Sequence, residues 1–170
     1  LTYPSPNVFT VGSAIANLSP TISGNVTSFS IAPALPAGLS FDTTTGIISG
    51  TPTMVSASAI YTVTATNSEG STSFGISITV NDIAPSSLSY SSPNVFSVGS
   101  SIANLSPTFS GNVTSFSITP ALPSGLLFDT ISGVISGTPT AVSATAIYTV
   151  TATNSGGLTS FGISITVKDI

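Results

Sequence analysis

The side chains in this sequence that could take part in chemistry are few. Five carboxylates and one amine carry all of the charge, giving a net charge of −4: Asp42, Glu69, Asp82, Asp129, Asp169 and Lys168. The chain has no His, Cys, Arg or Trp. Nucleophilic catalysis needs a neighbouring base or an activated thiol, and zinc, iron–sulfur and haem sites need His or Cys ligands. A single Lys cannot form the basic surface that binds nucleic acid. We therefore expect no catalytic residues and no nucleic-acid partner.

Two of the carboxylates stand at matching places. Asp42 and Asp129 each open a loop of the form Asp-x-x-x-Gly, at residues 42–46 and 129–133. Such a carboxylate could bind calcium or act as a general acid, and both tasks usually need a second acid nearby. The alternative is an Asx turn, in which the carboxylate accepts backbone N–H groups of its own loop. The sequence favours the Asx turn.

Asp82 is the candidate for a metal ion. It lies in the segment 80–85, between the two halves of the chain, and this segment resembles the calcium-holding linker of cadherins. Calcium takes six to eight oxygen ligands, usually with several carboxylates. Here Asp82 would have to act with backbone carbonyls. We expect no resident cofactor, with calcium at Asp82 as the alternative.

The two halves of the chain are near-copies of each other. Residues 1–83 align with 88–170 at a constant offset of 87 without a gap, and 67 of the 83 aligned pairs are identical. Residues 84–87 are expected to be a short linker. A unit of this length can bury its own core, which a solenoid repeat of about 20–50 residues cannot. We expect two self-contained domains in tandem.

Apolar residues alternate with Ser and Thr, which predicts strands and not helices. The clearest strands, 60–66 and 74–80, flank a turn at 67–70 and predict a hairpin. Shorter strands are expected at 7–11, 21–23, 26–31, 39–41 and 47–49. About seven short strands per copy favour an all-β sandwich of the immunoglobulin type. The predicted core of the first copy is Phe9, Ile31, Leu39, Ile48, Tyr61, Val63, Phe74, Ile76 and Ile78.

Exposed side chains offer two further interpretations. Thr62, Thr64 and Thr66 form a stripe that could face a ligand, although a solvated sheet face is favoured because Thr combines β-propensity with a polar tip. Carbohydrate binding would require exposed aromatic rings. Tyr61 is expected in the core by alternation, and Tyr3 is expected to pack at the end of its domain.

One segment resembles a known family. Residues 35–52 read LPAGLSFDTTTGIISGTP and residues 61–67 read YTVTATN, and the second copy repeats both at 122–139 and 148–154. This pattern resembles the bacterial immunoglobulin-like repeats of the He_PIG type, which are related to dystroglycan-type cadherin-like domains. The resemblance implies two tandem Greek-key β-sandwiches, at 1–83 and 88–170. It also implies an extracellular location on a bacterial surface.

Together these observations predict a non-catalytic tandem module of a bacterial surface or secreted protein, acting as a spacer or stalk or in adhesion. Its expected partners are neighbouring repeats of a longer chain, and a host matrix protein or glycan. The alternative is a carbohydrate-binding accessory module of a secreted polysaccharide-active protein. No run of about 20 apolar residues is present, so we expect no membrane insertion by this segment.

Overall fold

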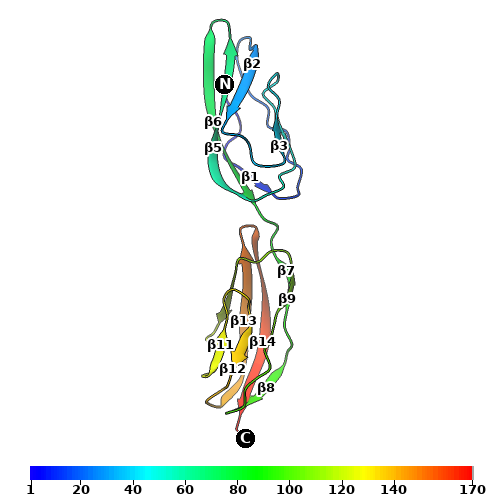
Figure 1. Cartoon of the computed structure of the whole chain (residues 1–170), viewed down its shortest axis with the longest axis vertical. Coiled ribbons are helices and arrows are strands. Elements are labelled where there is room, and N and C mark those ends of the chain that lie inside the picture. The colour runs from blue at the N-terminus through cyan, green and yellow to red at the C-terminus, as the bar shows by residue number, and fades with distance from the viewer. Residues whose placement is uncertain (170) are drawn as a thin grey trace. The chain divides into compact units, whose positions relative to one another are not determined.

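The computed structural model of the chain describes residues 1–169, and Ile170, the expected last residue of the second copy, lies outside them. The described residues form fourteen strands and no helix, which confirms the all-β prediction. The chain divides into two compact units, Leu1–Asp82 and Ile83–Ile170 (Figure 1). The division falls between Asp82 and Ile83. Ser86 and Ser87, expected in the linker, begin a strand of unit 2.

The larger sheet of unit 1 has four strands in the order β1-β6-β5-β2. They are β1 (Asn7–Thr10), β2 (Ser28–Ala32), β5 (Ser56–Asn67) and β6 (Gly70–Asn81). The two long strands form the predicted hairpin, with Asn67 opposite Gly70 across its turn. β1 pairs with β6 in parallel, whereas the other pairs are antiparallel. The first and last strands of the unit are thus neighbours.

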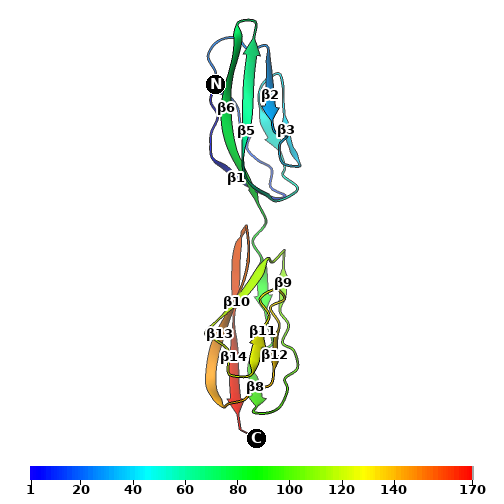
Figure 2. The same cartoon turned by 60° about the vertical axis from the view of Figure 1, so that its left-hand side comes forward.

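A second layer packs against this sheet. Its hairpin consists of β3 (Leu39–Phe41) and β4 (Ile48–Gly50), and Figure 2 shows β3 apart from the layer of β5 and β6. Leu18 forms an isolated bridge with Ile48, and Thr2 forms one with Thr21. The strand expected at 21–23 is reduced to this single bridge in unit 1.

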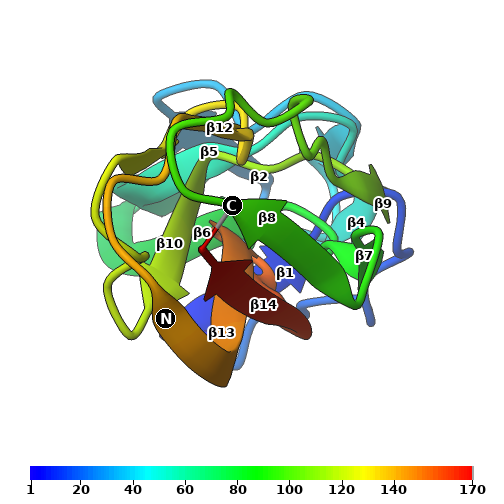
Figure 3. The ribbon, with the colours of Figure 1, turned by 90° about the horizontal axis from the view of Figure 1, so that it is seen from below.

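Unit 2 repeats the plan with eight strands, against six in unit 1. Its larger sheet has the order β10-β13-β14-β8, made of β8 (Asn94–Ser97), β10 (Ser115–Thr119), β13 (Ser143–Asn154) and β14 (Gly157–Lys168). Figure 3 shows β8 beside β14, to which it is parallel. The smaller pairs join β7 (Ser86–Ser89) to β9 (Thr108–Ser110), and β11 (Leu126–Phe128) to β12 (Ile135–Gly137).

Each unit has its own hydrophobic core, as a self-contained domain requires. All nine predicted residues of the first copy either belong to its core or pack against it. The prediction missed five buried side chains, which are Tyr3, Leu18, Phe29, Ala65 and Val80. Leu18 and Tyr3 lie outside the long strands, where alternation gives no signal.

Candidate functional site

The carboxylate of Asp42 lies in the loop between β3 and β4. Asp42 Oδ1 accepts hydrogen bonds from the backbone N–H of Thr44 at 2.7 Å and of Thr45 at 3.2 Å. The N–H of Gly46 donates to the Asp42 carbonyl at 2.8 Å and closes the loop. The bonds from Thr44 and Thr45 hold the pKa of the Asp42 carboxyl below its usual value, because they stabilise the charged form. This is the expected Asx turn, and Asp129 repeats it in unit 2.

The calcium-binding interpretation of these loops has no cluster of acidic side chains in the described chain to support it. Among residues 1–169, no three His, Cys, Asp or Glu side chains come together as a metal site. The acidic side chain of each loop therefore organises its own backbone.

Tyr3 holds this loop against the core. Its hydroxyl donates to the Gly46 carbonyl at 2.6 Å, and its side chain is 6% exposed. Its ring lies 6.4 Å from that of Phe74, between centroids. Burial raises the pKa of Tyr3 to about 12. Tyr3 is thus a core residue whose hydroxyl holds the loop, whereas we expected it from the sequence to pack at the end of its domain. In unit 2 the Tyr90 hydroxyl donates to the Gly133 carbonyl in the same way.

Asp82, the candidate calcium ligand, is the last residue of unit 1 and is half-buried. Calcium needs six to eight oxygen ligands. Because the described residues hold no cluster of three acids, an ion at Asp82 would depend mainly on carbonyl oxygens. Calcium at this position stays a prediction.

The Thr stripe lies on the outer face of the larger sheet. Thr62 and Thr66 are exposed, and the Thr64 hydroxyl forms a hydrogen bond of 2.9 Å with the Ser73 hydroxyl on β6. Thr151 and Ser160 form the same 2.9 Å bond in unit 2. Cross-strand hydroxyl pairs of this kind stabilise a solvated sheet face.

The four tyrosines are all buried, at 5–7% exposure, and they are Tyr3, Tyr61, Tyr90 and Tyr148. Phe109, at 40%, is the aromatic residue among the large exposed hydrophobics of the described chain. Carbohydrate-binding surfaces stack sugars on exposed rings, and this chain offers no set of them. The carbohydrate-binding alternative therefore has no support.

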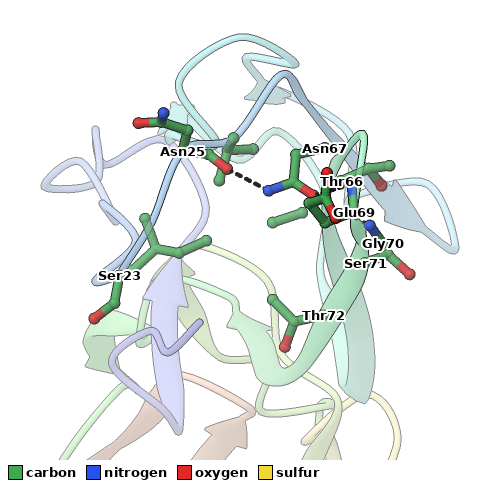
Figure 4. A pocket seen from close by; sticks show the side chains of 11 residues that line it. Ser23, Asn25, Thr66, Asn67, Glu69, Gly70, Ser71 and Thr72 are labelled. Carbon is green, nitrogen blue, oxygen red and sulfur yellow. Dashed lines mark hydrogen bonds between the residues drawn. The ribbon is translucent and has the colours of Figure 1, made fainter.

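A pocket of about 280 Å³ opens beside the β5–β6 turn of unit 1. Figure 4 shows Asn67, Glu69 and Gly70 on the turn side, with Ser23 and Asn25 on the facing loop. The Asn67 side chain joins the two sides, because its amide donates to the Asn25 carbonyl at 2.8 Å. The same side chain accepts from the N–H groups of Glu69 and Gly70, at 2.9 and 3.1 Å.

Sequence reasoning missed this pocket. Three lining positions differ between the two copies: Ile22 is Phe109, Glu69 is Gly156 and Ser71 is Leu158 in the second. Three differences among eleven lining residues are close to the share over the whole repeat, 16 of 83, so they give no signal for the pocket.

The fold and these sites define a tandem pair of immunoglobulin-like β-sandwich domains. The described residues include no helix long and apolar enough to cross a membrane. The chain belongs to the He_PIG family, described as "Putative Ig domain", whose sequence model matches residues 1–81 and 77–168.

The chain is similar in sequence to a bacterial adhesin. It is 36% identical, over 146 residues, to the "Serine-rich adhesin for platelets" of Staphylococcus aureus strain MRSA252 and of strain NCTC 8325. These matches cover 84% of this chain but only 11% and 6% of the two relatives. The chain therefore corresponds to a small part of those proteins.

Solved structures show the same fold at low identity. Extracellular domains 3–5 of Drosophila OTK align with a TM-score of 0.57 at 17% identity, covering 95% of this chain and 59% of that one. The four N-terminal Ig domains of Dscam1 isoform 8.4 align with a TM-score of 0.53 at 14% identity, covering 95% and 43%. These likenesses concern the fold alone.

Proposed function

We propose that the chain is a non-catalytic spacer segment of a bacterial surface or secreted protein, which presents an adhesive part carried elsewhere in that protein. The observation that carries this proposal is the likeness to a serine-rich adhesin of which the chain spans only 6–11%. A short tandem piece of so long a protein fits a repeated supporting part better than the whole adhesive function.

The side chains support this role. Both loop carboxylates are used within their own turns, and the hydroxyls of the larger sheet pair with one another across strands. The single cation, Lys168, is exposed at the end of β14. The two loop carboxylates and these hydroxyl pairs therefore serve the fold of their own units.

Strand pairing within each unit suits a part that carries tension. Because β1 and β6 run parallel, the start of β1 and the end of β6 lie at opposite ends of the pair. Tension on the chain then pulls along both strands and loads their hydrogen bonds together. β8 and β14 repeat the arrangement in unit 2.

Direct adhesion is the second candidate, because the relatives are named as adhesins for platelets. The two candidates differ in a measurable way. A spacer shows no saturable binding of its own but raises the accessibility of a part placed beyond it.

The test uses the 170-residue chain in two forms. Beads coated with it are offered to platelets and to arrays of matrix proteins and glycans, beside an unrelated Ig-fold protein of similar size. The chain is also inserted once or several times beneath a reporter domain on a bacterial surface. We expect no binding above the control and a reporter that becomes more accessible with each insertion. Saturable platelet binding by the coated beads would instead establish adhesion.

A further inference from the structure

The residues that line the pocket of unit 1 have equivalents in unit 2. In unit 2 these equivalent positions are covered by a segment of the chain. Residues 83–85, the first three of unit 2, lie over the positions equivalent to the pocket lining. Pro85 is buried among them, while the Ile83 side chain is 58% exposed. The covering segment is held by its backbone and by its small residues.

Asn154, the equivalent of Asn67, fixes this segment by hydrogen bonds. Its side-chain amide donates to the Ile83 carbonyl at 2.6 Å and to the Asn112 carbonyl at 2.9 Å. Its Oδ1 accepts from the N–H groups of Gly156 and Gly157. With all of these groups paired, Asn154 is only 6% exposed.

Two glycines of unit 2, Gly111 and Gly157, pack closely against this segment. A methyl group built on Gly111 would lie 3.5 Å from Pro85 Cα, and one on Gly157 would lie 3.1 Å from Ala84 Cβ. Their equivalents in unit 1 are Gly24 and Gly70. A methyl group on either of those would meet no heavy atom of the described residues within 4 Å.

Unit 1 carries the same receiving groups. Asn67 accepts from the same two turn positions and donates to Asn25, as Asn154 does to Asn112. The second N–H of the Asn67 amide, which in unit 2 meets the Ile83 carbonyl, has no acceptor among residues 1–169. Asn67 is accordingly half-buried, and Gly70 and Thr72 are exposed where their equivalents are half-buried.

We propose that this pocket of unit 1 is a docking site for the chain segment that leads into the unit in a longer protein. The segment it fits has the chemistry of Ile83-Ala84-Pro85: a backbone carbonyl for Asn67, a small side chain against Gly70 and a proline against Gly24. The relatives, many times longer than this chain, leave room for such a segment. The inference does not depend on the spacer role, since it concerns how one unit receives its incoming chain.

The lining of the pocket disfavours two other kinds of ligand. Glu69 lines it, so an anionic group would be repelled, and no tyrosine faces it to stack a sugar. A short, neutral and extended peptide satisfies the amide and fits beside both glycines. The partner is thus a segment of this same kind of chain.

The test adds Ile-Ala-Pro-Ser-Ser before Leu1 of the full chain, which is then labelled with ¹⁵N for NMR. We expect the Asn67 side-chain amide to shift toward the position of the Asn154 amide. We also expect the Asn67 amide protons to exchange about tenfold more slowly, because one more hydrogen bond protects them. An added Gly-Ser-Gly-Ser-Ser of equal length is the matched control and should leave both readouts unchanged.

Asn67→Asp supplies the second variant. Aspartate keeps the oxygen that accepts from Glu69 and Gly70 but lacks the amide donors, so the turn survives while the docking bond is lost. The Ile-Ala-Pro-Ser-Ser extension should then leave the Gly24 and Gly70 amides unshifted. Equal spectra for the two extensions would overturn the proposal. So would shifts that grow with concentration in the chain without an extension, because they would show that a second copy fills the pocket.

Discussion

At the scale of single residues, the two copies place the same demands on the same side chains. A carboxylate closes the loop between β3 and β4, a glycine takes the left-handed conformation at its end, and a tyrosine hydroxyl holds that glycine. Each of these groups acts on the backbone of its own unit. Among the described residues, these three groups close the same loop in both units.

The Asx turns make stability depend on acid pH. Because the folded pKa of Asp42 and of Asp129 is lowered, their contribution is present above the unfolded pKa of about 4 and is lost as the pH falls below it. We expect the urea midpoint to be level from about pH 7 to pH 5 and to fall below about pH 4. Urea titrations across this range measure the effect.

The matched variant is the double substitution Asp42→Asn and Asp129→Asn. Asparagine keeps an oxygen acceptor for the turn but does not titrate, so the fall below pH 4 should be shallower. An equal fall in the variant would assign the acid sensitivity to other carboxylates.

Gly46 should tolerate no side chain. At φ +73° a methyl group would lie 2.8 Å from the Tyr3 hydroxyl oxygen and 2.9 Å from the Phe29 ring. Gly12 has nearly the same φ, +78°, but open space around it. We expect Gly12→Ala to lower the free energy of unfolding by about 1 kcal/mol through backbone strain alone. Gly46→Ala should lower it by roughly 3 kcal/mol or more, since steric overlap is added.

Urea unfolding of both variants measures the difference. Unit 2 provides an independent repeat, because Gly133 meets Tyr90 and Phe116 in the same way. Equal losses for Gly12→Ala and Gly46→Ala would show that the Tyr3 contact shifts at little cost.

At the scale of elements, the first and last strands that pair in parallel in each larger sheet are the ones that a pull along the chain would load in shear. The pairing continues past β1, because the N–H of Val11 donates to the Asn81 carbonyl at 2.9 Å. A load along the chain has to break these bonds together before the unit opens.

Val11→Pro should lower the force at which unit 1 unfolds. Proline removes the N–H that bonds to Asn81 and so shortens the loaded ladder by one bond, worth about 1 kcal/mol. Val11→Ala is the control, because it loses packing but keeps the N–H. Single-molecule pulling on the full chain should show one of its two unfolding events at lower force with proline. An unchanged pair of events would place the load elsewhere.

Periodicity predicted the hairpin and its turn, because alternation over residues 60–66 and 74–80 leaves few other registers; the strands found are longer, at Ser56–Asn67 and Gly70–Asn81. Periodicity could not predict the partner of β1, since pairing between strands some 70 residues apart leaves no local pattern. Leu18 and Tyr3 were missed for a related reason, because neither lies in a strand with an alternating pattern. Leu18 forms an isolated bridge with Ile48, and Tyr3 is held by the hydrogen bond from its hydroxyl to the Gly46 carbonyl. The Asx turns were predictable from Asp and Gly spacing, whereas the pocket at Asn67 is formed by two segments some 40 residues apart, which leave no local pattern.

At the scale of the whole molecule, Ser and Thr hydroxyls, and not charged side chains, make up most of the polar side-chain groups. The chain has 33 Ser and 26 Thr against six charged side chains. The edge strands of the larger sheets, β1 and β2 in unit 1 and β8 and β10 in unit 2, carry no charge. Charged edge residues normally discourage edge-to-edge association.

We therefore expect association to rise near pH 4.1, the isoelectric point, where net repulsion vanishes. Ser30→Lys places a charge on the exposed face of edge strand β2, and Ser13→Lys places the same charge in an exposed loop. Both variants shift the isoelectric point equally. Light scattering of each variant at its own isoelectric point should be lower for Ser30→Lys. Equal scattering would show that association does not proceed through this edge.

The two long hairpins have one further consequence, for the order of folding. β5 and β13 are nearly the same strand, and β6 and β14 are nearly the same partner, with matching registers at Asn67–Gly70 and Asn154–Gly157. Side-chain complementarity alone therefore cannot distinguish the pairing of β5 with β6 from the pairing of β5 with β14. Closing the two-residue turn is favoured over closing a loop of some ninety residues, by about 0.6 kcal/mol for each doubling of loop length. Proximity along the chain, more than sequence, thus protects this protein from strand exchange between its halves.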